Sequence, residues 1–231
     1  MPKRYHYLEI ITVAFVLILI LSNLVGSAKI TQLCLAEDWC LSLSTGLLLF
    51  PVSYLIGDIL TEVYGYSASR RVIWTGFGAL LAANLIIQFF VVLPADPEWG
   101  LQQAYSQVFK MSLRISIASI IAFAAGEFTN SYVIAKLKLW LKGKHQWVRI
   151  IGSTMAGELV DTLIVIPLGF YGAQGYPVEI LFKIMMSKYV IKVVWEIIAY
   201  PLITVHLIKF LKTAEHEDYY DKDTNFNPFH L

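Results

Sequence analysis

Six apolar segments, each reaching the roughly 20 residues that a helix needs to cross a bilayer, dominate this sequence. They occupy residues 8–29, 44–65, 72–94, 112–136, 148–171 and 179–210. In hydrocarbon each backbone polar group must be bonded within the protein, so such segments fold as helices. Of the 231 residues, 57% are hydrophobic and only 15% are charged, whereas soluble domains are about 25% charged. We therefore expect an all-α polytopic membrane protein.

The charged residues between these segments alternate in sign and predict the orientation. Basic residues cluster before the first segment, at Arg70 and Arg71, between residues 136 and 149, and after residue 208. The other connections, 30–43 and 95–111, are mainly acidic. Because positive residues mark the cytoplasmic side, both termini are expected there. The predicted organisation is one six-helix transmembrane domain, residues 1–212, and a polar cytoplasmic tail, residues 213–231, that is disordered.

The two external connections carry further features. Cys34 and Cys40 fall in or beside the first, where an oxidising exterior would allow a disulfide. No histidine lies near them, so we expect no metal site. Residues 95–111 alternate aromatic and polar groups, which is compatible with a short interfacial helix over an entrance or with a plain connector.

Acidic residues inside the apolar segments point to a polar site. Asp58 and Glu62, four residues apart in SYLIGDILTEVY, share one face of a helix. The Ser-x-x-x-Gly-acid pattern of this stretch recurs in the fifth segment, where Glu158 is followed by Asp161. The fourth segment adds Glu127 and Asn130 after a glycine. A charge in hydrocarbon costs at least about 2.5–3.5 kcal/mol, so these groups must face the protein interior or water. The alternative is a short, partly exposed helix with charges at its ends.

The sixth segment places basic residues at the same membrane depth as these acids. Lys188, Lys192 and Glu196 lie one turn apart on one stripe, and six intramembrane acids then face two clear bases. Unmatched acids must be protonated, solvated or bound by a ligand that donates hydrogen bonds. Tyr54 and Trp195 are among the aromatic residues on which a flat heteroaromatic ligand could stack. A purely structural ion-pair network is the alternative explanation.

Three motifs, FPVSYLIGDILTEVYG, GEFTNSYVIAKLK and STMAGELVDTLIVIP, together with a last segment that carries lysine, resemble the queuosine precursor transporter family of vitamin-uptake-like transporters. The resemblance covers residues 23–201. It implies import of 7-cyano- or 7-aminomethyl-7-deazaguanine bases through the bacterial cytoplasmic membrane, without catalysis, cofactor, metal or nucleic acid. The family is also similar to the six-helix substrate-binding subunits of energy-coupling-factor transporters. The predicted substrate-binding residues are Tyr54, Asp58, Glu62, Glu127, Asn130, Glu158, Asp161, Lys188, Lys192 and Trp195.

Chemistry suggests roles for these groups. One carboxylate can accept the ring N–H and the exocyclic amine of a guanine-like edge, and Lys192 or Asn130 can donate to the base carbonyl. Another carboxylate could carry a coupling proton. Three points stay open: whether a coupling ATPase is a partner, whether the chain forms a homodimer, and whether the two halves are inverted three-helix repeats. A further alternative is an intramembrane aspartyl hydrolase with Asp58 and Asp161 as its dyad.

Overall fold

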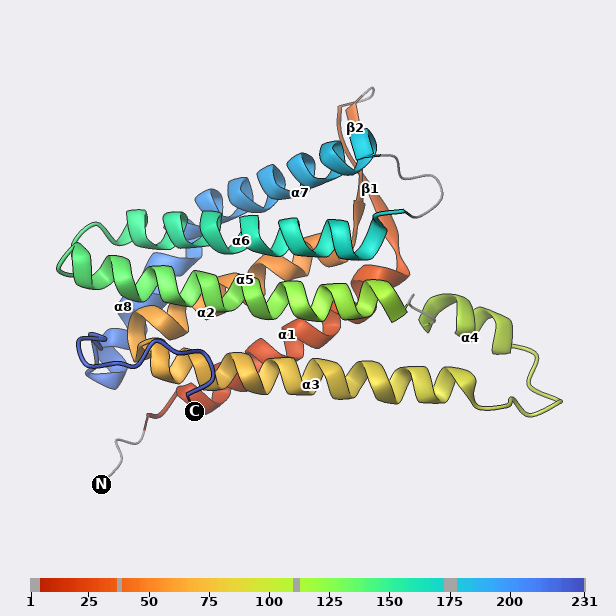
Figure 1. Ribbon diagram of the computed structural model, residues 1–231, viewed down its shortest axis with the longest axis horizontal. Coiled ribbons are helices and arrows are strands. Elements are labelled where there is room, and N and C mark those ends of the chain that lie inside the picture. The colour runs from red at the N-terminus through yellow and green to blue at the C-terminus, as the bar shows by residue number, and fades with distance from the viewer. Residues whose placement is uncertain (1–4, 37–38, 110–112, 173–177, 231) are drawn as a thin grey trace.

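The computed structural model describes residues 5–36, 39–109, 113–172 and 178–230. Their helices form a bundle (Figure 1) and comprise α1 (Leu8–Ala28), α2 (Gly46–Tyr64), α3 (Tyr66–Val92), α4 (Gln102–Phe109), α5 (Leu113–Trp140), α6 (Gln146–Phe170), α7 (Val178–Ala199) and α8 (Val205–Glu215). Among the described residues, four helical stretches are long and apolar enough to cross a membrane: Tyr66–Val92, Gln102–Trp140, Gln146–Phe170 and Leu181–Glu215. The expected helical, multi-pass membrane protein is therefore confirmed, whereas the number of six spans and their orientation stay predictions.

Helix α2 lies at the centre of the bundle. It contacts α1, α3, α5, α7 and α8, and every residue from 53 to 64 is buried. A helix inside a bundle can carry charge that a lipid-facing helix cannot, because neighbouring helices supply partners in place of water. This explains why Asp58 and Glu62 occur on a helix that is otherwise apolar.

The boundary between α2 and α3 differs from the sequence prediction. The third segment was expected to begin at residue 72, with Arg70 and Arg71 in the connection, but α3 begins at Tyr66. Gly65 alone separates the two helices, with φ of 82°, a positive value that glycine adopts without steric cost. Arg70 is buried inside α3 and donates to the carbonyl oxygens of Asn225 and Asn227 at 2.7 Å each.

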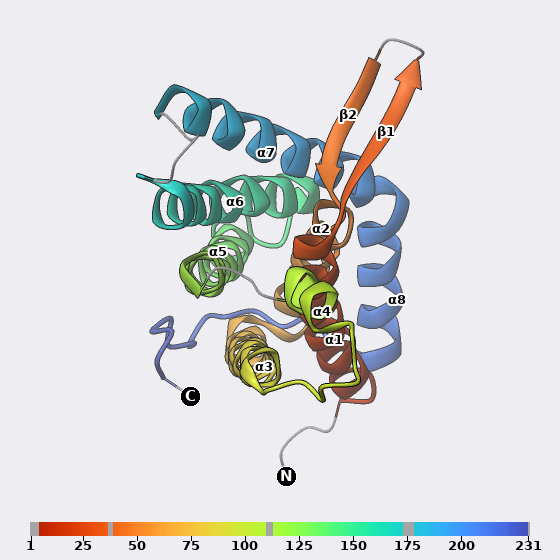
Figure 2. The same ribbon diagram turned by 90° about the vertical axis from the view of Figure 1, so that its right-hand side faces the viewer.

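The first connection that was expected to be external contains a β-hairpin. Strands β1 (Ile30–Ala36) and β2 (Trp39–Ser44) pair antiparallel and extend away from the helices (Figure 2). Their register places Cys34 opposite Cys40, but these side chains lie outside the described part of the structure, so the disulfide stays a prediction. In the second connection α4 forms a short helix, as one of the two alternatives anticipated.

The last predicted segment is interrupted. Helix α7 ends at Ala199, residues Tyr200–Thr204 form one π-helical turn, and α8 follows. Pro201 lies in this turn, and proline removes a backbone donor, which favours a local widening or kink. Figure 2 shows that α8 then runs in a different direction from α7.

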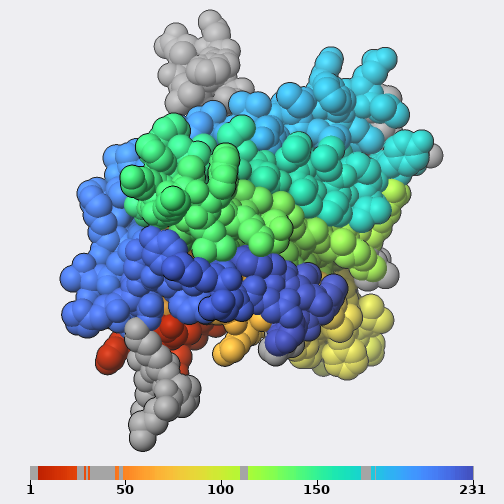
Figure 3. Space-filling view, turned by 60° about the vertical axis from the view of Figure 1, so that its left-hand side comes forward, coloured from red at the N-terminus to blue at the C-terminus, as the bar shows by residue number. Residues whose placement is uncertain are grey.

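Residues 216–230 pack against the bundle, which differs from the disordered tail predicted from Thr213. The carboxylate of Asp221 accepts the backbone N–H of Tyr66 at 3.1 Å, and Trp74 Nε1 donates to the carbonyl oxygen of Pro228 at 2.8 Å. The ring of Phe226 contacts Tyr66. Figure 3 shows this segment as a dark-blue band across the surface. The sequence prediction considered only the polar composition of this segment. Its aromatic rings and backbone carbonyl groups in fact make contacts with α3.

Candidate functional site

Eight of the ten predicted site residues lie in two polar clusters. The central cluster lies between α2, α5, α6 and α7 and consists of Tyr54, Asp58, Glu127, Asn130, Thr154, Glu158, Asp161, Lys192 and Glu196. The inner cluster lies at the end of the bundle near the C-terminal segment and consists of Glu62, Lys138, Arg149, Lys212 and Asp218. The central cluster is buried, and in the inner cluster Glu62, Lys138 and Arg149 are buried whereas Lys212 and Asp218 are partly exposed.

Asp58 is held by groups from two other helices. Asn130 Nδ2 on α5 donates to its Oδ1 at 2.6 Å, and Thr154 Oγ1 on α6 lies 3.4 Å from its Oδ2. Glu196 of α7 is an electrostatic neighbour. The side chain of Asp58 is fully buried. These bonds fix the position of the carboxylate and link three helices through it.

Lys192 supplies the positive charge of the central cluster. Its Nζ donates to Glu158 Oε2 at 2.5 Å and to Asp161 Oδ2 at 2.7 Å, so α7 is tied to α6. The same atom lies 4.6 Å from the ring centre of Phe50 and 5.8 Å from that of Tyr54. Aromatic faces are thus present beside the charged groups, as the sequence suggested for Tyr54.

Glycines allow the helices to approach closely around the cluster. A Cβ on Gly157 would lie 2.8 Å from the carbonyl oxygen of Gly126, so α5 and α6 meet with almost no side chain between them. A Cβ on Gly57 would lie 2.5 Å from Glu127 Oε2. The small residues therefore place the acids of facing helices in one volume.

Several buried acceptors in the central cluster have no hydrogen-bond partner among the described residues. They are Glu127 Oε1 and Oε2, Asn130 Oδ1, Glu158 Oε1, Glu196 Oε1 and Oε2 and the Tyr54 hydroxyl. Most of these atoms can only accept, and buried acceptors are normally satisfied. The central cluster is also rich in acids: Asp58, Glu127, Glu158, Asp161 and Glu196 face Lys192. This arrangement suits a ligand that brings hydrogen-bond donors.

Glu62 belongs to the inner cluster and does not join Asp58, unlike the sequence prediction. Arg149 donates to both of its oxygens, at 2.6 and 3.3 Å, and Lys212 Nζ lies 2.8 Å from Oε1. Lys138 Nζ is 3.6 Å from the same oxygen and also donates to Asp218 at 2.6 Å. Glu62 is thus saturated by cations, which leaves it no evident capacity for a substrate.

Asp218 connects the C-terminal segment to this network. Burial acts to raise the pKa of its carboxyl, but hydrogen bonds from Lys138 and Lys212 and the charges of these lysines outweigh burial, so the pKa lies below its ordinary value. The carboxylate therefore remains ionised at neutral pH and holds residues 216–230 against α5 and α8.

Two predicted residues lie outside both clusters. Lys188 is one turn along α7 from Lys192, and its Nζ lies 6.0 Å from the ring centre of Phe170. Trp195 packs against the apolar core. Conversely, sequence reasoning missed Thr154, and it treated Lys138 and Arg149 as loop charges although both are buried in helices. For Lys138 and Arg149 the sequence contained a signal, because both lie within one helical turn of a predicted segment end.

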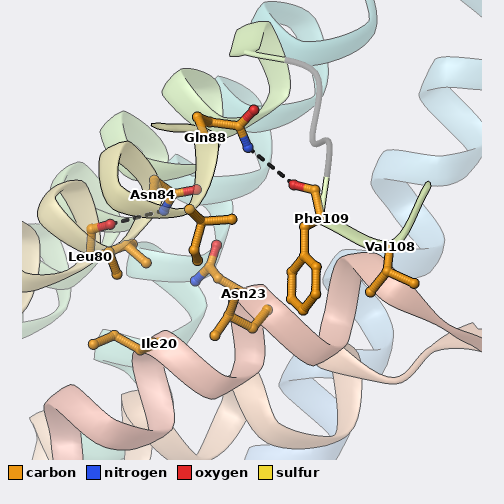
Figure 4. Close-up of a pocket in the computed structure, with 10 residues that line it drawn as sticks. Ile20, Asn23, Leu80, Asn84, Gln88, Val108 and Phe109 are labelled. Atoms are coloured by element: carbon orange, nitrogen blue, oxygen red, sulfur yellow. Dashed lines mark hydrogen bonds between the residues drawn. The ribbon is translucent and has the colours of Figure 1, made fainter. Parts of the chain in front are cut away.

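A separate pocket lies between α1, α3 and α4 (Figure 4). Its polar lining consists of the amide side chains Asn23, Asn84 and Gln88, and Gln88 Nε2 donates to the carbonyl oxygen of Phe109 at 3.1 Å. The remaining lining is apolar and contains no acid. This pocket lacks the charged groups that distinguish the central cluster, which remains the candidate site.

Comparisons with known proteins show which family the chain belongs to. A family model described as "Putative vitamin uptake transporter" matches residues 44–206. A Bacillus subtilis protein named "Probable queuosine precursor transporter" is 28% identical over 167 residues, which cover 71% of this chain and 72% of that protein. A Haemophilus influenzae protein with the same name is 25% identical over 143 residues, 62% of this chain and 58% of that protein. No solved structure matches.

Proposed function

Because the chain belongs to the vitamin uptake transporter family, we propose that it imports queuosine precursors, bases of the 7-cyano- and 7-aminomethyl-7-deazaguanine type, across the bacterial inner membrane. A membrane transporter follows from the family and from the apolar helices. The substrate is inferred from the names of the two relatives and from the chemistry of the central cluster.

The observation that carries the substrate proposal is the set of buried acceptors without donors. Atoms of Asn130, Glu158 and Tyr54 are buried and lack partners among the described residues. A deazaguanine base has a ring N–H and an exocyclic amine side by side on one edge, and a pyrrole N–H on the opposite side. Such a ligand satisfies several acceptors at once, and bonds to an ionised carboxylate are the stronger ones.

The proposed binding mode uses groups from facing helices. Glu158 accepts the ring N–H and the exocyclic amine, and Asn130, oriented by its bond to Asp58, accepts the pyrrole N–H. Lys192 turns partly from its two carboxylates to donate to the base carbonyl. The rings of Phe50 and Tyr54, which already lie beside Lys192, cover the flat face of the base.

The proposed architecture is six spans with both termini cytoplasmic and the site near the membrane centre. The inner-cluster contact between Glu62 of α2 and Arg149 of α6, followed by that between Asp58 and Thr154, shows that α2 and α6 run antiparallel. This relation is expected of inverted repeats with a site at their interface. Dependence on an ATPase, as in energy-coupling-factor transporters, is the second candidate, and a homodimer stays a prediction.

The test is competition for uptake of radiolabelled 7-aminomethyl-7-deazaguanine by 7-deazaguanine and by 7-deazahypoxanthine, which differ only in the exocyclic amine. Loss of one hydrogen bond to a charged group costs about 1.5–3 kcal/mol. We therefore expect 7-deazahypoxanthine to compete roughly ten- to a hundredfold more weakly. Glu158→Gln should reduce this discrimination, and the matched change Glu179→Gln, at an exposed residue, should preserve it. Equal competition by the two bases in the unaltered protein would reject the binding mode.

A further inference from the structure

Glu127 and Glu196 are the two acids of the central cluster whose carboxylate oxygens have no hydrogen bond within the described part of the chain, but the side chain of Glu196 lies against that of Asp58. The side chain of Glu127 is fully buried in the middle of α5. It lies against Gly57 of α2, where a Cβ would be 2.5 Å from Oε2. The fold therefore makes room for this carboxyl group without giving it a donor.

The charges around Glu127 are unfavourable to a further negative charge. The cation Lys192 interacts with Glu127 electrostatically, but its Nζ already bonds Glu158 and Asp161. The groups that face Glu127 are, from α2, Tyr54 and Asp58, from α6, Glu158 and Asp161, and from α7, Lys192 and Glu196. An isolated carboxylate in a dry, predominantly acidic site is strongly destabilised, so such a group takes up a proton.

We propose that Glu127 is the proton-binding site of the transporter, protonated in this closed state and exchanging its proton with water when the site opens to either side. The coupling part of the proposal, one proton carried with each base, rests on the proposed function. The protonation part depends only on the geometry around Glu127.

The proposed cycle follows from solvation. When the site opens outward, the carboxylate is in contact with the external solution, and an O–H bond forms with a proton taken from that solution as the site closes. Closure removes the water, which favours the neutral carboxyl group over the charged one. Opening inward restores water, the O–H bond breaks, and the proton leaves on the other side. One proton is bound and one is released, and no electrons are transferred.

The first experiment detects the proton directly. The purified full-length protein in liposomes is compared with Glu127→Gln by infrared spectroscopy, in the absence of any base. We expect the unaltered protein to show the carbonyl-stretch band of a protonated carboxyl group, and this band to decrease in Glu127→Gln. The matched variant Glu179→Gln changes an exposed acid and should keep the band. A spectrum that is the same with and without Glu127 would overturn the proposal.

The second experiment measures coupling. A pH-sensitive dye inside the liposomes reports proton entry while uptake of 7-aminomethyl-7-deazaguanine is counted. We expect about one proton per base, accumulation driven by an alkaline interior, and loss of both effects in Glu127→Gln. Base uptake without proton entry in the unaltered protein would overturn the coupling. If no base is transported, the proposed function fails, whereas the infrared band still decides the protonation of Glu127.

Discussion

Gly157 provides the most direct test of how the central cluster is assembled. In Gly157→Ala the new Cβ would lie 2.8 Å from the carbonyl oxygen of Gly126 and 2.9 Å from Asn130 Cβ. Both are on α5 and belong to the backbone or its first side-chain atom, so no flexible side chain can move aside. Helix α5 must shift away from α6, and the bond from Asn130 to Asp58 moves with it.

The expected change in the free energy of unfolding follows from two opposing contributions. Overpacking a tight contact costs about 1–3 kcal/mol, while alanine in place of glycine favours a helix by about 0.8–1.0 kcal/mol. Because backbone atoms form the contact, we expect a net loss of roughly 1–2 kcal/mol. For a protein of this size that lowers the melting temperature by about 2–8 °C.

Gly152 on the same helix supplies the matched control. A Cβ there would meet only Leu137 Cδ1, at 3.8 Å, which is an ordinary van der Waals distance. Gly152→Ala should therefore retain or raise the melting temperature, and it should leave uptake intact, whereas Gly157→Ala should lower both. Unfolding in detergent micelles is followed by tryptophan fluorescence. A melting temperature for Gly157→Ala equal to that of Gly152→Ala would refute the argument that close backbone contact builds the site.

Two further predictions concern the inner end of the bundle. A reporter fused after Leu231 should be active only in its cytoplasmic form, because basic residues mark that side; activity of an external form would reject the orientation. Asp218→Asn should loosen the C-terminal segment at neutral pH, because each exposed ion pair contributes about 0–1 kcal/mol. The expected result is a hydrogen-exchange rate at the Tyr219 amide that is a few-fold faster after correction for intrinsic rates. Because the pKa of Asp218 is lowered in the folded protein, its contribution is present above the unfolded pKa and is lost as the pH falls through the folded one, so the two proteins should converge in acid.

The helical class was predictable from the sequence because hydrocarbon permits few alternatives for long apolar segments. The ends of the segments were less predictable, since charges were taken to mark connections. Arg70 and Arg149 instead lie within helices, where they find acceptors in the C-terminal segment and on Glu62. The turn at Gly65 depends on a single backbone conformation, which composition does not reveal.

The division of the acids into two clusters was not predictable. Spacing correctly places Asp58 and Glu62 on one side of α2, but four residues also separate them by about 6 Å along the axis. Their partners are set by the antiparallel register with α6, which brings Thr154 to Asp58 and Arg149 to Glu62. Sequence spacing within one helix contains no information about that register.

The repeated Ser-x-x-x-Gly-acid pattern has a common physical meaning in the two helices. In α2, Ser53 Oγ donates to the carbonyl oxygen of Phe50 at 2.6 Å, and in α6, Ser153 Oγ donates to that of Ile150 at 2.8 Å. Each serine hydroxyl thus bonds an acceptor within its own helix, and the small side chain occupies little space between the helices.

The glycines of the pattern have equivalent positions as well. Gly57 faces Glu127 on α5, and Gly157 faces Gly126, the residue before it. Helices α2 and α6 therefore approach the same level of α5 from two sides with small residues, and the acid that follows each glycine enters the shared volume. Because the two helices run antiparallel, the Ser-x-x-x-Gly-acid pattern runs in opposite directions along them. Many transporters with alternating access have inverted repeats with the site at their interface, so this relation between the two walls favours a carrier over a site with one fixed entrance.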